Sequence, residues 1–335
     1  MIDEEDLSLV HALQVRPRAS WTELGEVLGC TPATAARRWE RLAEAGSAWV
    51  TAVPGPNCSA LTAYVGLRCA PGTREEVAAA LAHDPAAVTV EITAGSHDLL
   101  VEVITADLAS FGRYLLDRVE RLPGVTGSTV AIATDVVTEA SRWRLDALAP
   151  VQSAALGRAD RPGGVPGRSL TELDRRLLTG LGRDGRLAWH QLGQAAGTSA
   201  ATARRRTERL VGSGEAALRC DVAGPLFERP VTVSLWARVP APELVAVARH
   251  LAAVPSVRFV ATTAARENLL VTLWLRRAEE VHRLEADLAA RHPDVLVQDR
   301  TIALRTAKRM GRLFDASGHG VGSVPLAPWA EPAPR

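Results

Sequence analysis

Two stretches of the sequence place arginines at helical spacing. The first, TPATAARRWERL, covers residues 31–42, and the second, SAATARRRTERL, covers residues 199–210. Side chains three or four positions apart lie on one face of a helix. One face of each predicted helix therefore carries a threonine and three arginines: Thr34, Arg37, Arg38 and Arg41 in the first, and Thr202, Arg205, Arg206 and Arg209 in the second. Arginine contacts phosphates or binds guanine edges through two hydrogen bonds, so this face predicts contact with DNA.

The arginine face has a second interpretation. On a solvated helix surface, Arg37, Arg38 and Arg41 would pair with Glu40 and Glu44 of the same helix. One copy alone leaves the two interpretations about even. Because the face occurs twice within a matching frame, contact with DNA is favoured.

The two stretches belong to a duplicated module. At an offset of 168 residues, 17 of the 41 positions between residues 6 and 46 are identical, without a gap. A repeat of this length is a whole duplicated unit and not a solenoid repeat. The copies have diverged, for example at Ala36 against Arg204 and at Trp39 against Thr207.

Each copy begins with the pattern of a winged helix-turn-helix. Ser20, followed by Glu23, predicts a capped second helix. Thr31 caps the arginine-bearing helix, and residues 48–53 form a β-prone run after it. Thr31, with Ser199 in the second copy, lies at the helix start that enters a major groove, so both complete the predicted DNA-binding set.

The remainder of each copy predicts the order β-α-β-β-α-β, which is the ferredoxin-like arrangement. In the first copy the elements are residues 61–69, 74–82, 88–94, 99–105, 108–121 and 125–137; in the second they are 231–238, 243–253, 257–264, 269–275, 278–290 and 295–304. Two helices cover one face of such a sheet, so the other face is free to pack on a partner sheet.

The predicted fold class is α+β, with two winged helix-turn-helix domains, each followed by a ferredoxin-like domain, in an intramolecular pseudo-dimer. The predicted boundaries are 1–54 and 60–148 for the first copy, 149–168 for a flexible linker, 169–224 and 229–314 for the second copy, and 315–335 for a disordered tail. Glycine and proline are frequent in the linker and in the tail.

Composition excludes several classes of protein. The net charge is only +1, so any binding to DNA must come from a local patch. The four cysteines, Cys30, Cys58, Cys69 and Cys220, lie far apart, and neither a metal site nor a cofactor is expected. No apolar run reaches the ~18 residues of a membrane-spanning helix. The first residues are acidic where a signal peptide would be basic, so the sequence predicts a soluble, cytoplasmic protein.

These features together resemble the Lrp/AsnC family of transcription regulators, with two complete protomers fused end to end. The residues that carry the resemblance are Leu173-Asp174, Asp184-Gly185-Arg186, the arginine-rich helices, TAGSHDLLV at 93–101 and Leu122-Pro123-Gly124-Val125. Members of that family pair through the sheets of their ligand-sensing domains and place two winged helices on DNA, and their dimers often assemble into rings. The resemblance implies a regulator that binds a double-stranded operator, with further assembly of pseudo-dimers possible. Because the copies have diverged, we expect unequal half-sites.

The resemblance also implies an effector, typically an amino acid, close to a glycine and an acidic residue in the turn before the third strand of the sheet. Gly95, His97 and Asp98 match that turn, and Asp98 could accept a hydrogen bond from a ligand ammonium. A plain hairpin turn also favours glycine and aspartate and is the alternative. The second copy reads Ala265-Arg266-Glu267-Asn268 there, so any response to a ligand is expected to be asymmetric.

Two other functions stay open. The siroheme decarboxylases of heme biosynthesis resemble the same family and work as paired, non-identical subunits; that function would use side chains such as His97, Arg113 and His250. The doubled arginine face argues against it, because an enzyme has no need of that face, and the sequence shows no nucleophile–base pair or phosphate loop. We therefore expect no enzymatic activity. The other possibility is a sensor that has lost DNA binding and acts through protein partners.

Overall fold

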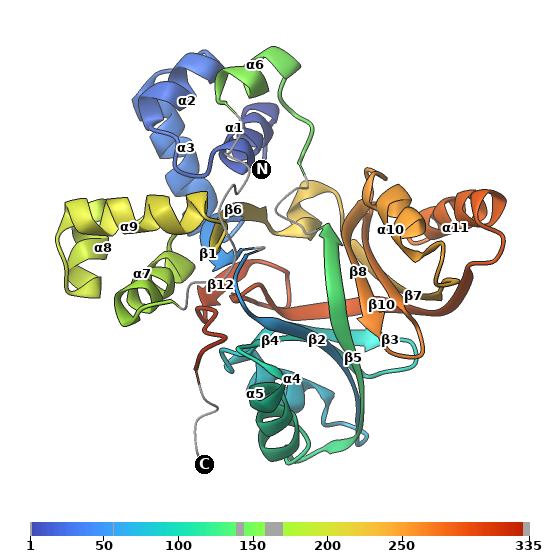
Figure 1. Ribbon diagram of the computed structural model, residues 1–335. Coiled ribbons are helices and arrows are strands. Elements are labelled where there is room, and N and C mark those ends of the chain that lie inside the picture. The colour runs from blue at the N-terminus through green and yellow to red at the C-terminus, as the bar shows by residue number, and fades with distance from the viewer. Residues whose placement is uncertain (1, 56, 139–143, 158–169, 331–335) are drawn as a thin grey trace.

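The structure is a computed structural model that describes residues 2–55, 57–138, 144–157 and 170–330. Two helical domains lie next to each other, and strands from both copies form a barrel beside them (Figure 1). The first helical domain contains α1 (Glu4–Val15), α2 (Trp21–Leu28) and α3 (Pro32–Glu44), and the second contains α7 (Glu172–Arg183), α8 (Trp189–Ala196) and α9 (Ala200–Gly212). Among the described residues, no helix combines the length and the apolar character needed to cross a membrane.

Local sequence signals set the starts of these helices. Ser20 caps α2, and the side chain of Glu23 returns a bond to the backbone of Ser20, as the capping box predicts. Thr31 caps α3 through the backbone N–H of Thr34, and Ser199 caps α9 in the same way. These caps satisfy backbone N–H groups that have no partner within the helix.

Each copy forms a four-stranded sheet with the ferredoxin-like strand order. The first copy supplies β2 (Leu61–Cys69), α4 (Arg74–Ala82), β3 (Ala87–Ala94), β4 (Leu99–Thr105), α5 (Leu108–Arg113), a π-helical turn η1 (Tyr114–Val119) and β5 (Val125–Thr138). The second supplies β7 (Val231–Arg238), α10 (Leu244–Ala252), β8 (Val257–Ala264), β9 (Leu269–Leu275), α11 (Glu280–Arg291) and β10 (Leu296–Arg309). The strand orders are β3-β4-β2-β5 and β8-β9-β7-β10, all antiparallel.

The two sheets are joined at their edges as well as facing each other. β5 pairs with β8, and β10 pairs with β3, so all eight strands have a neighbour on both sides and the sheet closes into a barrel. Sequence analysis predicts only that the free faces pack together. The additional pairing arises because β5 and β10 are long, with 14 residues each, and reach past their own sheets.

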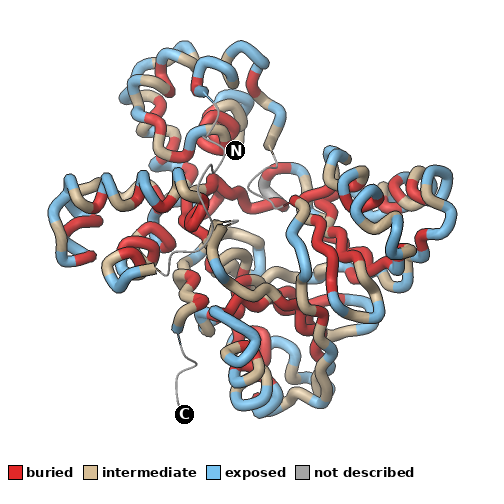
Figure 2. The backbone as a smooth tube through the Cα atoms, viewed as in Figure 1, coloured by how far each residue is buried: buried red, intermediate tan, exposed pale blue. Residues whose placement is uncertain are grey.

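Buried residues follow this division (Figure 2). One apolar core lies between the first sheet and its helices, and an equivalent core lies in the second copy. A third cluster fills part of the space between the sheets, where the ring of Tyr64 makes edge contacts with Trp236 at 6.2 Å and with Phe259 at 5.8 Å. Edge-to-face contacts are a favoured geometry for aromatic pairs.

The two helical domains share an antiparallel ribbon of two strands. β1 (Ala48–Pro54) pairs with β6 (Ala216–Val222) over the whole length of both, from Ala48 opposite Val222 to Pro54 opposite Ala216. Each strand also packs in the other copy's helical domain. Cys220 and Val222 belong to the core of the first domain, and Ala52 belongs to the core of the second.

Arg18 of the first helical domain reaches into the second. Its Nη1 donates a hydrogen bond to the carbonyl oxygen of Gly185 at 2.5 Å, and its Nη2 donates to that of Leu187 at 2.9 Å. The guanidinium carbon lies 3.7 Å from the ring centroid of Trp189. This geometry combines two charge-assisted hydrogen bonds with a cation–π contact.

Arg186 makes the equivalent contacts in the opposite direction. Its guanidinium donates to the carbonyl oxygens of Pro17 at 2.7 Å and Ala19 at 2.9 Å, and lies 4.0 Å from the ring centroid of Trp21. Burial lowers the pKa of Arg186 to about 10, and the nearby Arg18 adds to this effect. We call this reciprocal pair the arginine clasp. It fixes the position of one helical domain relative to the other.

The segment after β5 folds back on the first helical domain. The backbone N–H groups of Ala147 and Leu148 both donate to Nδ1 of His11, at 3.0 and 2.9 Å. Residues 149–168 are predicted as a flexible linker, but Pro150–Ala155 form helix α6, and Leu156 is buried in the core of this domain. The remainder of that linker, 158–169, lies outside the described residues.

The end of the chain also differs from the prediction. Sequence analysis predicts disorder over 315–335, whereas residues 315–330 pack on the protein, with β11 (Arg312–Phe314) and β12 (Gly320–Ser323) forming a hairpin. Leu326 is buried, and Trp329 packs on the second helical domain. Isolated apolar residues in a Gly/Pro-rich segment were sufficient to anchor it, because the helical domains and the barrel offer apolar surface. Residues 331–335 lie outside the described part of the chain.

Removal of the clasp should destabilise the helical domains. We expect Arg18→Ala and Arg186→Ala each to lower the free energy of unfolding by about 2–3 kcal/mol, from two charge-assisted hydrogen bonds and a ring contact. The exposed ion pair of Arg16 with Glu23 provides a control, and Arg16→Ala should cost less than about 1 kcal/mol. Urea unfolding followed by tryptophan fluorescence measures the three values. Equal values for all three variants would show that the clasp adds no stability.

The contact of His11 predicts a dependence of stability on pH. Burial lowers the pKa of His11 below 6.5, and its Nδ1 must be unprotonated to accept two N–H groups. The unfolded chain then binds a proton more readily than the folded one, so stability is full above the ordinary pKa of 6.5 and falls as pH drops below it. Unfolding measured from about pH 8 to about pH 5 should show this loss. The variant His11→Gln should flatten the profile, while His190→Gln, at an exposed position, should leave it unchanged.

Candidate nucleic-acid interface

The turn before each arginine-bearing helix is tight because glycine permits it. A Cβ at Gly25 would lie 2.6 Å from the carbonyl oxygen of Cys30, and one at Gly193 would lie 2.8 Å from that of Thr198. Gly29 ends α2 with a φ of 69°, in the left-handed region that glycine adopts at low cost. These glycines set the angle at which α3 and α9 leave the preceding helices.

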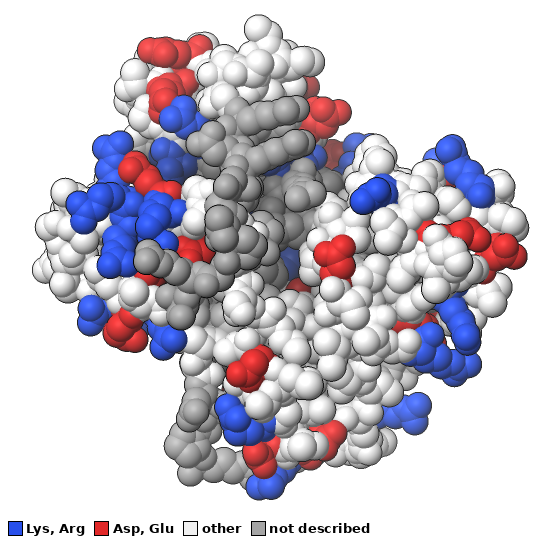
Figure 3. Space-filling view, viewed as in Figure 1, with Lys and Arg blue, Asp and Glu red and all other residues white. Residues whose placement is uncertain are grey.

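One face of each of these helices is buried, and the opposite face is exposed. Ala35, Trp39 and Leu42 pack into the first helical domain, and Ala203, Thr207 and Leu210 pack into the second. Arginine side chains gather on the surface over α9 and the neighbouring end of α3 (Figure 3). At the helix starts, the hydroxyls of Thr31 and Thr34 lie 2.9 Å apart, and those of Ser199 and Thr202 lie 3.1 Å apart.

Two arginines of α3 hold that helix to α1. Nη1 of Arg38 donates to the carboxylates of Asp3 at 2.9 Å and Asp6 at 3.0 Å, and Arg41 donates to Asp6 at 2.5 Å. Arg38 also pairs with Glu5. The partners are thus acidic residues at the start of α1, and not the Glu40 and Glu44 that the surface interpretation predicts. Because the side chain of Asp6 is fully buried, its charge depends on these guanidiniums.

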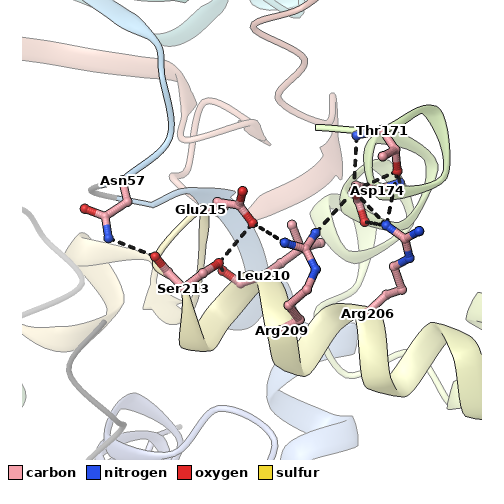
Figure 4. A network of polar contacts seen from close by, with 8 residues as sticks. All are labelled: Asn57, Thr171, Asp174, Arg206, Arg209, Leu210, Ser213 and Glu215. Atoms are coloured by element: carbon pink, nitrogen blue, oxygen red, sulfur yellow. Dashed lines mark hydrogen bonds and ion pairs between the residues drawn. The ribbon is translucent and has the colours of Figure 1, made fainter. Parts of the chain in front are cut away.

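The second helical domain repeats this arrangement (Figure 4). Arg206 lies 3.1 Å and Arg209 lies 3.3 Å from the buried carboxylate of Asp174, and Arg209 also bonds Glu215 at 2.7 Å. Burial opposes ionisation of Asp174, but hydrogen bonds from Thr171 together with the two guanidiniums outweigh it and lower the pKa of Asp174 below its ordinary value. Asp174 is therefore a charged anchor for α9.

The remaining arginine on each face projects freely. Arg37 and Arg205 are exposed, and among the described residues neither makes a hydrogen bond or an ion pair. Arg204, which has no counterpart in the first copy, pairs with Glu208 at 2.8 Å on the exposed surface. The structure therefore divides the six predicted arginines into two that face solvent and four that link helices.

The predicted effector turn is engaged by its own surroundings. Asp98 accepts the backbone N–H of Cys69 at 2.8 Å and forms an ion pair with Arg74. His97 lies 2.6 Å from the hydroxyl of Thr129. A Cβ at Gly95 would lie 3.1 Å from the carbonyl oxygen of Arg300, so the turn abuts β10 of the second copy.

Asn268 replaces Asp98 in the second copy and does the same structural work. Its Oδ1 accepts the N–H of Val239 at 2.8 Å, and its Nδ2 donates to the carbonyl oxygen of Val239 at 2.8 Å. Both side chains thus fasten the turn to the first strand of their own sheet. This shared role accounts for an amide taking the place of the carboxylate without a change in the fold.

The residues suggested for a decarboxylase do not form a site together. His97 contacts Ser96 and Thr129, Arg113 bonds Ser110 within α5, and His250 lies 3.3 Å from Asp287 on the helices of the second copy. None of His97, Arg113 and His250 is among the residues that line the cavity between the two sheets.

Sequence analysis missed the charged residues in that cavity. Glu91, Glu102, Arg258 and Arg309 stand on strands of the barrel and line the cavity. The signal was a charged residue inside an otherwise apolar, alternating strand, which points to an inward position that is not part of an ordinary core.

Comparison with known families matches both halves of this arrangement. The model of the AsnC-type helix-turn-helix domain matches residues 2–43 and again residues 170–211, and that of the Lrp/AsnC ligand binding domain matches residues 62–143. An uncharacterized HTH-type transcriptional regulator of Pyrococcus horikoshii is 30% identical over 146 residues, which is 42% of this chain and 96% of the relative. The HTH-type transcriptional regulator Ptr1 of Methanocaldococcus jannaschii is 27% identical over 145 residues, 42% of this chain and 98% of its own.

One solved structure matches the two copies together. The siroheme decarboxylase NirDL aligns with a TM-score of 0.60 over 92% of this chain and 93% of its own, at 14% identity. At that identity the likeness concerns the fold alone. The repeated helix-turn-helix match and the regulators that are similar to one copy show that the chain belongs to the Lrp/AsnC family of DNA-binding transcription regulators, with two protomers joined in tandem.

Proposed function

We propose that the chain reads an operator with two unequal half-sites, one through α3 and the other through α9. The observation that carries this proposal is the pair of capped, exposed helices that one ribbon and one arginine clasp hold in a fixed relation. Two-fold readers bind half-sites about one DNA turn (~34 Å), or a multiple of it, apart. The fixed relation supports a single preferred spacing.

Within each half-site we assign two roles to the predicted DNA-binding residues. Thr31, Thr34 and Arg37, with Ser199, Thr202 and Arg205 in the second copy, lie at the exposed start and face of the helix and would contact DNA directly. Arg38, Arg41, Arg206 and Arg209 hold the helix to Asp6 or Asp174 and retain 24–47% side-chain exposure, which leaves room for phosphate contacts. Arg204 adds a charge to the second surface only, which supports unequal recognition.

An effector site at Gly95, His97 and Asp98 remains a prediction, and so does further assembly of pseudo-dimers. The engaged state of Asp98 means that a ligand ammonium would have to replace Arg74 there. As a consequence, any amino-acid response through this turn should involve movement of α4, which carries Arg74.

Selection of bound fragments from the host genome tests the proposal most directly. Purified protein, competitor DNA and near-physiological salt should yield a motif with two dissimilar halves in a fixed spacing. The salt matters because phosphate contacts alone give steeply salt-dependent, sequence-indifferent binding. Recovery of only such binding would contradict the proposal and leave a partner-binding sensor or an enzyme to be tested.

Single substitutions should separate contact from anchoring. Arg37→Ala is expected to weaken operator binding by about 10-fold or more and relax preference in one half-site, as for an arginine that reads a base, with unfolding unchanged. Arg205→Ala should do so in the other half-site. Arg38→Ala should in addition cost about 2 kcal/mol of stability, since it removes one partner of the buried Asp6.

Binding of variant operators, each altered in one half, combined with thermal unfolding distinguishes these outcomes. Glu208→Ala serves as a control on the exposed surface of α9. If Arg37→Ala and Arg205→Ala weaken binding equally to every sequence, the two arginines contact phosphate only.

A further inference from the structure

A cavity of about 600 Å³ lies between the two sheets, at the end of the barrel next to the ribbon. Strands from both copies line it, and so does Arg219 of β6, which belongs to the ribbon that the helical domains share. Its apolar lining includes Leu100, Phe259 and Leu270. The volume and the mostly apolar walls with a few polar groups are typical of small-molecule sites.

Guanidinium groups gather on one side of the cavity. The guanidinium carbon of Arg258 lies 3.6 Å, and that of Arg309 4.8 Å, from the ring centroid of Trp274 on β9. The side chains of Arg219 and Arg258 are 3% and 5% exposed, and both pair with Asp221, at 2.6 and 2.8 Å. Three cations thus lie close together in a region that water reaches poorly.

The carboxylates nearby do not balance these cations fully. Asp221 serves two guanidiniums, and Glu91 pairs with Arg309 at 3.1 Å. Burial raises the pKa of Glu102, whose Oε2 accepts the hydroxyl of Thr89 at 2.9 Å, so this group favours its neutral form more than an exposed carboxyl does. Two ionised carboxylates against three guanidiniums leave an excess of one positive charge.

Burial also lowers the pKa of Arg258 well below its ordinary value, and although Asp221 counteracts this, Arg219 and Arg309 add to it. Clustered cations in a poorly solvated place favour an anion beside them, because it relieves both their desolvation and their mutual repulsion.

We propose that this cavity binds a small amphipathic monoanion, whose apolar or aromatic body lies between the sheets and whose single carboxylate lies beside Arg219, Arg258 and Arg309. The site is distinct from the Gly95–Asp98 turn, of which no residue lines the cavity. An occupant that bonds Arg219 contacts the ribbon that carries both helical domains. This regulatory consequence rests on the proposed function, whereas binding itself does not.

Calorimetric titration of the full chain with 1-naphthoate tests the proposal, with 1-naphthamide as the uncharged partner of the same shape. We expect the acid to bind at least about 10-fold more tightly than the amide, because only the acid forms charge-assisted hydrogen bonds with the arginines. The titration contains no DNA, so its outcome is separate from that of the operator selection.

Two cavity variants and one control locate the site. The double variant Glu91→Gln with Arg309→Gln keeps a hydrogen-bonding pair in place, and should reduce the affinity of the acid toward that of the amide. Thr272→Phe fills the cavity from β9 and should weaken both probes, which keeps the test available where the double variant does not fold. Arg113→Gln, on the outer helix α5 and outside the cavity lining, should leave both affinities unchanged.

Three results would overturn the proposal: no saturable binding of 1-naphthoate, equal affinities for acid and amide, or an unchanged affinity for the acid in folded forms of both cavity variants. Circular dichroism establishes that each variant is folded.

Discussion

The exchange of Arg18 and Arg186 between the helical domains is the contact on which the rest of the arrangement depends. Each guanidinium bonds two backbone carbonyls and covers a tryptophan in the other copy, at the corner where the first helix turns into the second. The ribbon of β1 and β6 alone would leave the domains free to rotate about its axis. With the clasp in place, the positions of α3 and α9 follow from the positions of α1 and α7.

The helix starts could be predicted because their causes are local. Ser20 with Glu23, and Thr31 with Pro32, act within one turn of the chain, and the sequence shows them directly. The strand order of each sheet followed from a known pattern of alternation. In contrast, the partners of Arg38 and Arg206 lie 32 residues away, in the first helix of the same domain. Spacing along one helix indicates which residues share a face, but not which other helix lies against it.

The same distinction explains what was missed at the barrel and at the end of the chain. Closure of the sheets depends on β5 and β10 extending beyond their own copy, which composition does not encode. The end of the chain reads as low in apolar content, yet Leu326 and Trp329 find surfaces that exist only after both copies have folded. Within the effector turn, Asp98 and Asn268 look like a functional difference in sequence, although both fasten the same turn.

Closure of the barrel has a consequence for the cell in which this regulator works. A cell that holds several related regulators risks mixed pairs wherever their sheets present edges or faces to one another. In the described part of this chain, each of the eight barrel strands already has neighbours on both sides, and the neighbours across the junction come from the same polypeptide. Exchange of a half with a paralogue would require a covalently tethered competitor to be displaced. The chain is thereby insulated from cross-talk with its relatives, and its two halves are always present in equal number, whatever else the cell expresses.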